Sequence, residues 1–141
     1  MAEGCTCLLL KLRGSDFPQK DNSYAEGWKA DPFYTLRSQY SPPGDGYAGE
    51  HKDKAPYKSK KCKQDLDPQW RYMAIDLQRL CNMNLDQKLL LDVYDWDRFS
   101  EPDFMSYIEV SPRQLIDAQG SHTGFTLRPP PPPHKQEVGR E

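Results

Sequence analysis

The residues best suited to chemistry are three aspartates within residues 93–103, a segment with the sequence VYDWDRFSEPD. The run before it, residues 88–92, predicts a strand. Alternate residues of a strand share a face, so Asp95 and Asp97 can point the same way where this strand ends. Asp103 follows Pro102, where the loop is expected to turn back and return a third carboxylate to that place. Crowded carboxylates raise each other's pKa unless a cation neutralises them. Oxygen ligands without sulfur or imidazole suit Ca²⁺ or Mg²⁺, and a flexible loop favours Ca²⁺.

A simpler interpretation is that these aspartates only shape turns, because an Asp side chain can hydrogen-bond its own backbone. A second acidic segment upstream argues against it. Asp21 and Asp31 bracket residues 22–30, and Asp31 leads directly into a predicted strand. The loops of a β-sandwich cluster at its two ends, so segments distant in sequence can build one site. The five carboxylates would together carry a charge of −5, which two Ca²⁺ ions would nearly balance.

The composition is that of a single globular domain. The chain has 141 residues, thirteen prolines and a formal net charge of −2. Nothing global therefore demands nucleic acid or a membrane, and any attraction must come from local patches. The apolar runs are too short to span a bilayer or to form a signal-peptide core. The four cysteines lack C-x-x-C spacing, which argues against zinc, and Cys5 and Cys7 are expected to be buried in a strand. These features favour a cytoplasmic protein.

The elements that must position the aspartates are short strands separated by Pro-, Gly- and Asp-rich turns. This pattern predicts an all-β, antiparallel sandwich with little helix. Strands are expected at residues 5–13, 32–37, 57–63, 70–77, 88–95, 104–110 and 125–127. Residues 78–87 are expected to form a crossover with one helical turn, and residues 114–118 a short turn.

The domain is expected to cover residues 1–128, with an inserted loop at 38–56. A Pro-rich tail follows at residues 129–141. Its five consecutive prolines prefer the polyproline II conformation, which has no internal hydrogen bonds.

Four motifs occur along the chain in an order that is itself informative. They are L-x-G-x-D-F-P-x-x-D at 12–21, D-P-F-Y at 31–34, L-D-P-Q-W at 66–70 and V-Y-D-W-D-R-F-S-x-x-D at 93–103. This ordered set resembles the C2 domain family over about residues 5–127, and residues 80–82 and 85–88 look most like copine C2 domains. The resemblance implies a Greek-key sandwich of the type II (permuted) topology. It also implies a module that binds Ca²⁺ and then docks onto anionic phospholipid membranes.

The resemblance assigns roles by position. The carboxylate ligands of two or three Ca²⁺ ions would be Asp21, Asp31, Asp95, Asp97 and Asp103. The carbonyls of Lys20 and Trp96 and the hydroxyl of Ser100 correspond to the family's minor ligands. Phe99, with Arg98 beside it, falls where the family has a membrane-inserting residue, although a partly buried loop anchor is the alternative. Trp28 and Tyr24 could also insert, or could pack their own loop down.

Four lysines fall on a strand that is basic in many C2 domains: Lys58, Lys60, Lys61 and Lys63. In a strand, Lys58 and Lys60 would share one face, and Lys61 and Lys63 the other. Contact with phosphoinositide head groups would contribute ~1 kcal/mol per lysine near an anionic surface. The alternative is a solvated edge strand that its lysines protect from aggregation.

Three features depart from the family pattern. The segment between Asp21 and Asp31 is longer than usual, Ser106 stands where glycine is usual, and only seven strands are expected. The eighth strand could lie outside this sequence, or a partner could supply it.

The alternative function is a C2-fold module for protein docking or assembly with little dependence on Ca²⁺ or lipid. Its contacts would be the Pro-rich tail, the inserted loop or an unpaired strand edge. An enzyme is not expected, because His51, His122 and His134 are isolated in the sequence and no nucleophile accompanies a base.

Deleting residues 134–141 should leave the fold intact, because the prolines before them cannot donate hydrogen bonds to a sheet. Thermal unfolding of the shortened chain should stay cooperative, with an unchanged midpoint. Loss of cooperative unfolding would mean that these residues form a strand that the pattern does not reveal.

Overall fold

The computed structural model describes residues 7–15, 31–39, 43–44, 57–63, 65, 67–97, 101–119 and 124–131. Its strands are β1 (Cys7–Leu10), β2 (Pro32–Ser38), β3 (Tyr57–Lys58), β4 (Met73–Asp76), β5 (Leu89–Asp95) and β6 (Asp103–Val110). Its helices are α1 (Leu77–Cys81) and α2 (Pro112–Asp117). Neither of these two short helices could cross a bilayer.

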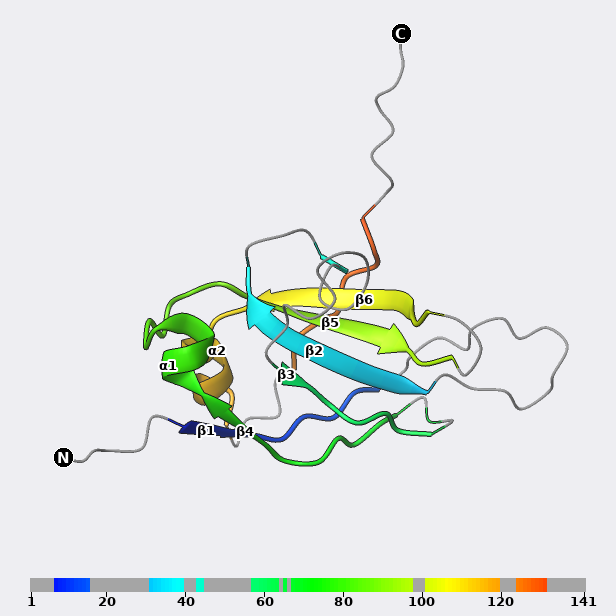
Figure 1. Cartoon of the computed structure of the whole chain (residues 1–141), viewed down its shortest axis with the longest axis horizontal. Coiled ribbons are helices and arrows are strands. Elements are labelled where there is room, and N and C mark those ends of the chain that lie inside the picture. The colour runs from blue at the N-terminus through cyan, green and yellow to red at the C-terminus, as the bar shows by residue number, and fades with distance from the viewer. Residues whose placement is uncertain are drawn as a thin grey trace, which may run out of the picture.

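The strands form two antiparallel sheets that lie in layers (Figure 1). The larger sheet has the order β3-β2-β5-β6, and the smaller one pairs β1 with β4. The expected all-β, antiparallel sandwich is therefore confirmed. The permuted topology stays a prediction, and so do the domain boundaries at 1–128 and 129–141.

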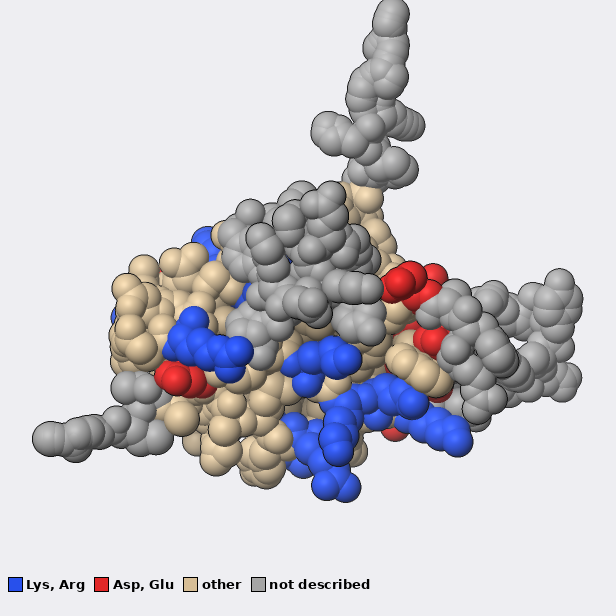
Figure 2. Space-filling model, in the orientation of Figure 1, with Lys and Arg blue, Asp and Glu red and all other residues tan. Residues whose placement is uncertain are grey.

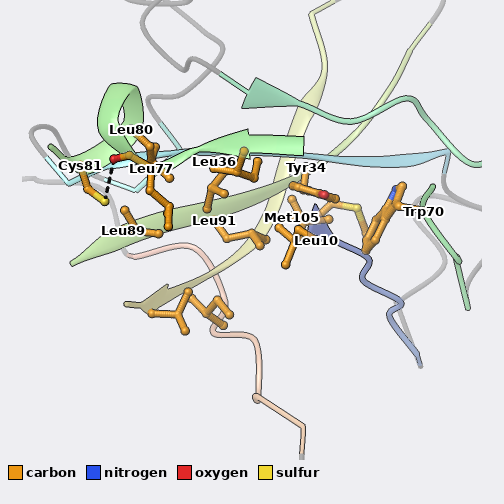
Figure 3. Close-up of a cluster of buried hydrophobic side chains, with 14 residues drawn as sticks. Leu10, Tyr34, Leu36, Trp70, Leu77, Leu80, Cys81, Leu89, Leu91 and Met105 are labelled. Atoms are coloured by element: carbon orange, nitrogen blue, oxygen red, sulfur yellow. Dashed lines mark hydrogen bonds between the residues drawn. The ribbon is translucent and has the colours of Figure 1, made fainter. Parts of the chain in front are cut away.

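The main core lies between the two sheets (Figure 3). It takes Tyr34 and Leu36 from β2 and Leu91 from β5, together with Leu10 and Trp70. The Trp70 ring meets the Tyr34 ring edge-on, with centroids 5.0 Å apart, and its Nε1–H donates to the carbonyl of Pro32 at 3.1 Å. Trp70 therefore ties the core to the first residue of β2.

The other face of the four-stranded sheet is buried as well. The rings of Phe33 and Tyr94 stack there at a centroid distance of 5.3 Å. Beside them, Arg37 Nη2 lies 3.5 Å from Asp92 Oδ2, and both side chains are fully buried. A buried ion pair of this kind loses its solvation, so its partners depend strongly on one another. This second buried face explains why six of the seven residues in both β2 and β5 are inaccessible.

The pairing of β5 with β6 contains a register shift between Val93 and Tyr94. Val93 is paired with Ser106, whereas Tyr94 is paired with Phe104, so Met105 is the extra residue on β6. Such a bulge reverses the alternation of side chains. Met105 consequently joins the main core, and Phe104 lies on the opposite face near Tyr94. Ser106 lies at this shift.

Several strand predictions were too long. The strand expected at 5–13 covers only β1 in the described residues, and Cys7 is exposed rather than buried. The strand expected at 57–63 ends at Lys58. Residues 125–127 form no strand; the neighbouring Arg128 makes an isolated bridge with Tyr107. The described part of the chain thus contains six strands rather than seven.

Helical capping explains two other differences. The strand expected at 70–77 ends at Asp76, whose carboxylate accepts from the backbone N–H groups of Gln78 and Arg79 and so begins α1. The turn expected at 114–118 is the end of α2, which begins with a capping box between Ser111 and Gln114.

Replacing Tyr34 by Phe should leave stability near neutral pH unchanged or slightly higher. The Tyr34 hydroxyl is buried and finds no hydrogen-bond partner among the described residues, and a buried unpaired hydroxyl costs about 1–3 kcal/mol. Burial raises the pKa of Tyr34 to about 12 from its usual 10.0. The folded state therefore keeps the proton more tightly than the unfolded state, so the free energy of unfolding is unaffected by this group below pH 10.0 and falls as the pH rises toward 12.

Denaturant unfolding at pH 8 and pH 11 measures both effects. The Tyr34→Phe variant should lose less stability than the parent between these two pH values. Equal losses in the two proteins would contradict the burial argument.

Candidate functional site at one end of the sandwich

Three of the predicted carboxylates lie at the same end of the four-stranded sheet. Asp95 is the last residue of β5 and Asp103 the first of β6, and the two are register partners. Asp31 immediately precedes Pro32, which is paired with Asp95. Because these neighbouring strands are antiparallel, β2 and β6 begin where β5 ends. We call Asp31, Asp95 and Asp103 the acidic end.

Two hydrogen bonds continue the pairing of β2 with β5 into the acidic end. The backbone N–H of Asp31 donates to Asp95 Oδ1 at 2.9 Å, and the backbone N–H of Trp96 donates to the carbonyl of Asp31 at 3.1 Å. A carboxylate offers about four lone-pair positions, and the bond from Asp31 uses one of those of Asp95. Asp31 and Asp95 are half-buried, whereas Asp97 and Asp103 are exposed.

The described residues supply only part of the predicted ligand set. Asp31, Asp95, Asp97, Asp103 and the carbonyl of Trp96 are described, while Asp21, Lys20 and Ser100 lie outside the described residues. Within the described ranges, no three acidic, histidine or cysteine side chains are grouped so that they could hold a metal ion. The donor chemistry fits a hard cation, because every predicted ligand offers oxygen. Completion of the site by Asp21 stays a prediction.

The lysine-rich residues 58–63 lie beside the acidic end. The backbone N–H of Ser59 donates to the carbonyl of Tyr34 at 2.8 Å, and that of Cys62 to the carbonyl of Pro32 at 2.9 Å. These bonds extend the contact with β2 beyond the two residues of β3. Figure 2 accordingly shows basic and acidic atoms close together at this end of the molecule.

The predicted alternation of the lysines is wrong, because only Tyr57 and Lys58 are in a strand. All four lysines are exposed. The ammonium of Lys58 lies 5.7 Å from the centroid of the Phe33 ring. Phe33 is on the face of the four-stranded sheet away from the main core, which we call the outer face. The ammonium of Lys61 lies 3.5 Å from the centroid of the Trp96 ring, and Trp96 directly follows Asp95 in the sequence. Lys61 therefore lies beside the acidic end, through a contact with Trp96 that no local sequence pattern signals.

Cys62, next to Lys61, behaves as a neutral thiol. Burial raises its pKa, nearby Asp65 adds to the rise, and a hydrogen bond with the backbone of Gln69 opposes it. A thiol that keeps its proton is a poor metal ligand, so the chemistry beside the acidic end is that of oxygen donors and lysines.

Four residues predicted to meet the membrane lie outside the described residues: Tyr24, Trp28, Arg98 and Phe99. Their assignment rests on the sequence resemblance and stays a prediction.

Comparison with known proteins shows which family the sequence and the fold resemble. The family profile of the C2 domain matches residues 9–127. The solved structure titled BON1-C2B is similar with a TM-score of 0.66 and 18% identity, over 86% of this chain and 74% of that one. The C2A domain of plant Extended Synaptotagmin 1 is similar with a TM-score of 0.54 and 21% identity, over 80% and 73%. At these identities the structures show the fold alone, and the likeness to copines stays a prediction. The profile covers most of the sequence, and the chain belongs to the C2 domain family.

Proposed function

We propose that this C2 domain docks onto anionic phospholipid membranes when Ca²⁺ binds at its acidic end. The observation that carries the proposal is the convergence of Asp31, Asp95 and Asp103 at one end of the sheet, held by the hydrogen bond from Asp31 to Asp95. The described residues alone form no group of three side chains that could hold a metal ion, so the proposal needs Asp97 and Asp21 to complete a set of oxygen ligands that suits Ca²⁺.

The ions would be held by the carboxylates of Asp21, Asp31, Asp95, Asp97 and Asp103, the carbonyls of Lys20 and Trp96 and the hydroxyl of Ser100. Bound Ca²⁺ would cancel most of the negative charge and offer coordination positions to lipid phosphates. The chain's own contribution is to hold Asp95 and Asp103 side by side and to orient the Asp95 carboxylate through the Asp31 N–H.

Membrane contact would come from the residues around the acidic end. Phe99, with Trp28 and Tyr24, would enter the lipid interface, and burial of Phe99 would contribute about 1.5–3 kcal/mol. Arg98 and the lysines Lys58, Lys60, Lys61 and Lys63 would attract anionic head groups through a force that salt screens over roughly 8 Å. The domain would then act as a cytoplasmic binding module, not an enzyme, that moves to the membrane surface when Ca²⁺ rises.

Co-sedimentation with phosphatidylserine liposomes tests this proposal. Binding should require Ca²⁺ and should be abolished by Asp95→Asn combined with Asp97→Asn, because these changes remove two of the five carboxylates. Phe99→Ala should weaken binding at every salt concentration, since burial of an aromatic ring is not screened. Arg98→Ala should weaken it mainly at low salt.

Binding of equal strength in Ca²⁺ and in EGTA would contradict the proposal. It would favour instead a C2-fold module that docks onto proteins.

Lys61 and Lys58 provide a matched pair for the electrostatic part of the proposal. Lys61 lies over Trp96 at the acidic end, whereas Lys58 lies over Phe33 on the outer face. Lys61→Ala should weaken Ca²⁺-dependent liposome binding about fivefold at low salt, since each lysine near the surface contributes ~1 kcal/mol. Lys58→Ala should have a smaller effect, and Lys61→Arg should retain binding.

Equal losses for Lys61→Ala and Lys58→Ala over a series of salt concentrations would show that the two lysines act only through net charge. That result would contradict a specific contact between Lys61 and the membrane.

A further inference from the structure

Gly44, far from the acidic end in sequence, packs against the outer face of the four-stranded sheet. Its carbonyl accepts a hydrogen bond from the hydroxyl of Tyr94 at 2.9 Å. A Cβ atom at Gly44 would lie only 2.6 Å from Cδ2 of Phe104, and the φ angle of Gly44 is +88°. Both the contact and the left-handed backbone would strain any other residue at this position. The main chain at Gly44 therefore rests directly on the Phe104 ring and is tied to Tyr94.

Tyr94 and Phe104 are the neighbours of the two paired aspartates. Tyr94 is paired with Phe104 across β5 and β6, and the next pair is Asp95 with Asp103. The rings of Tyr94 and Phe104 lie 5.7 Å apart, tilted by 44°. Contacts that fix these two rings on the outer face therefore also fix the strand pair next to Asp95 and Asp103.

The bulge in β6 determines on which face of the sheet Phe104 lies. Met105, the extra residue, points into the core, and Phe104 points outward toward Tyr107 at a centroid distance of 6.2 Å. Successive residues of a strand alternate between faces. With Phe104 outward, Asp103 falls on the same face as Met105, and Asp95 on the same face as Val93. The outward position of Phe104 is therefore what places Asp95 and Asp103 on one face.

Tyr94 forms the fixed side of the contact. Its hydroxyl lies 2.9 Å from the Gly44 carbonyl and 3.4 Å from Asp92 Oδ2. A phenol has one hydrogen to donate, and the shorter distance assigns it to Gly44. The Tyr94 ring also stacks on the Phe33 ring, with centroids 5.3 Å apart, so a ring contact fixes its position together with the hydrogen bond to Gly44.

We propose that Gly44 is a positioning residue for the acidic end. By resting on Phe104 and accepting from Tyr94, it stabilises the shifted register that sets Asp103 beside Asp95. The inference rests on the proposed function in that the positioned groups are the proposed Ca²⁺ ligands. Coupling between two sites is reciprocal, so displacement of Gly44 lowers Ca²⁺ affinity, and Ca²⁺ binding strengthens the contact at Gly44.

Amide hydrogen exchange in EGTA tests the positioning without any metal. The reporters are the backbone N–H groups of Asp31 and Trp96, whose hydrogen bonds define the acidic end. Gly44→Ala should speed their exchange about tenfold, and Tyr94→Phe, which removes the hydroxyl that binds the Gly44 carbonyl and keeps the ring, about fivefold. The control is Val110→Ala, which removes buried methyl groups at the end of β6 that lies away from Asp103. It should leave this exchange unchanged apart from its effect on global stability.

Calorimetric Ca²⁺ titration of the same proteins supplies the second measurement. Gly44→Ala and Tyr94→Phe should bind Ca²⁺ at least fivefold more weakly than Val110→Ala. Exchange at Asp31 and Trp96 that is the same in Tyr94→Phe and Val110→Ala, after correction for global stability, would overturn the positioning role. If Gly44→Ala fails to fold, Tyr94→Phe decides alone. A parent protein that binds no Ca²⁺ would overturn the proposed function, while the exchange rates would still decide whether Gly44 positions the acidic end.

Discussion

The antiparallel ladder between β2 and β5 is the constraint on which the candidate site depends, because it carries Asp31 to Asp95. The ladder runs from Ser38 paired with Leu89 to Pro32 paired with Asp95, and the bonds between Asp31, Asp95 and Trp96 extend it by one step. Burial of both faces of these strands supplies the free energy that holds the strand ends together. A cation that binds only the folded acidic end adds to stability by mass action.

Much of the fold follows from local pattern. The apolar runs of β2 and β5 and the Pro- and Gly-rich turns predict an antiparallel sandwich, and the structure confirms it. The errors arise where a local signal was outweighed by another one. The strand expected through Leu77 gives way to α1 because Asp76 caps the helix, and the turn expected near Gln114 is helical because Ser111 and Gln114 form a capping box. Both capping signals are present in the sequence.

The site is less accessible from sequence than the fold. The order of motifs predicts Asp31, Asp95 and Asp103 at one end, and the strand pairing brings these three residues there, while their role as ligands stays a prediction. The contact of Lys61 with Trp96 spans 35 residues, and that of Gly44 with Phe104 spans 60. Neither has a local signature, because both depend on how a loop returns to the sheet. The bulge at Met105 is equally hidden, because one extra residue in a strand leaves no compositional trace.

Calorimetric titration with Ca²⁺ is the most direct test of the claim that the acidic end binds cations. The informative variant is Asp95→Asn, and its matched control is Asp86→Asn, which removes the same charge from an exposed ion pair with Arg113. The account predicts saturable binding by the parent, nearly unchanged binding by Asp86→Asn and binding at least tenfold weaker by Asp95→Asn, as expected when a ligand of a hard cation loses its charge. Absence of binding by the parent, or equal affinities for Asp95→Asn and Asp86→Asn, would contradict it.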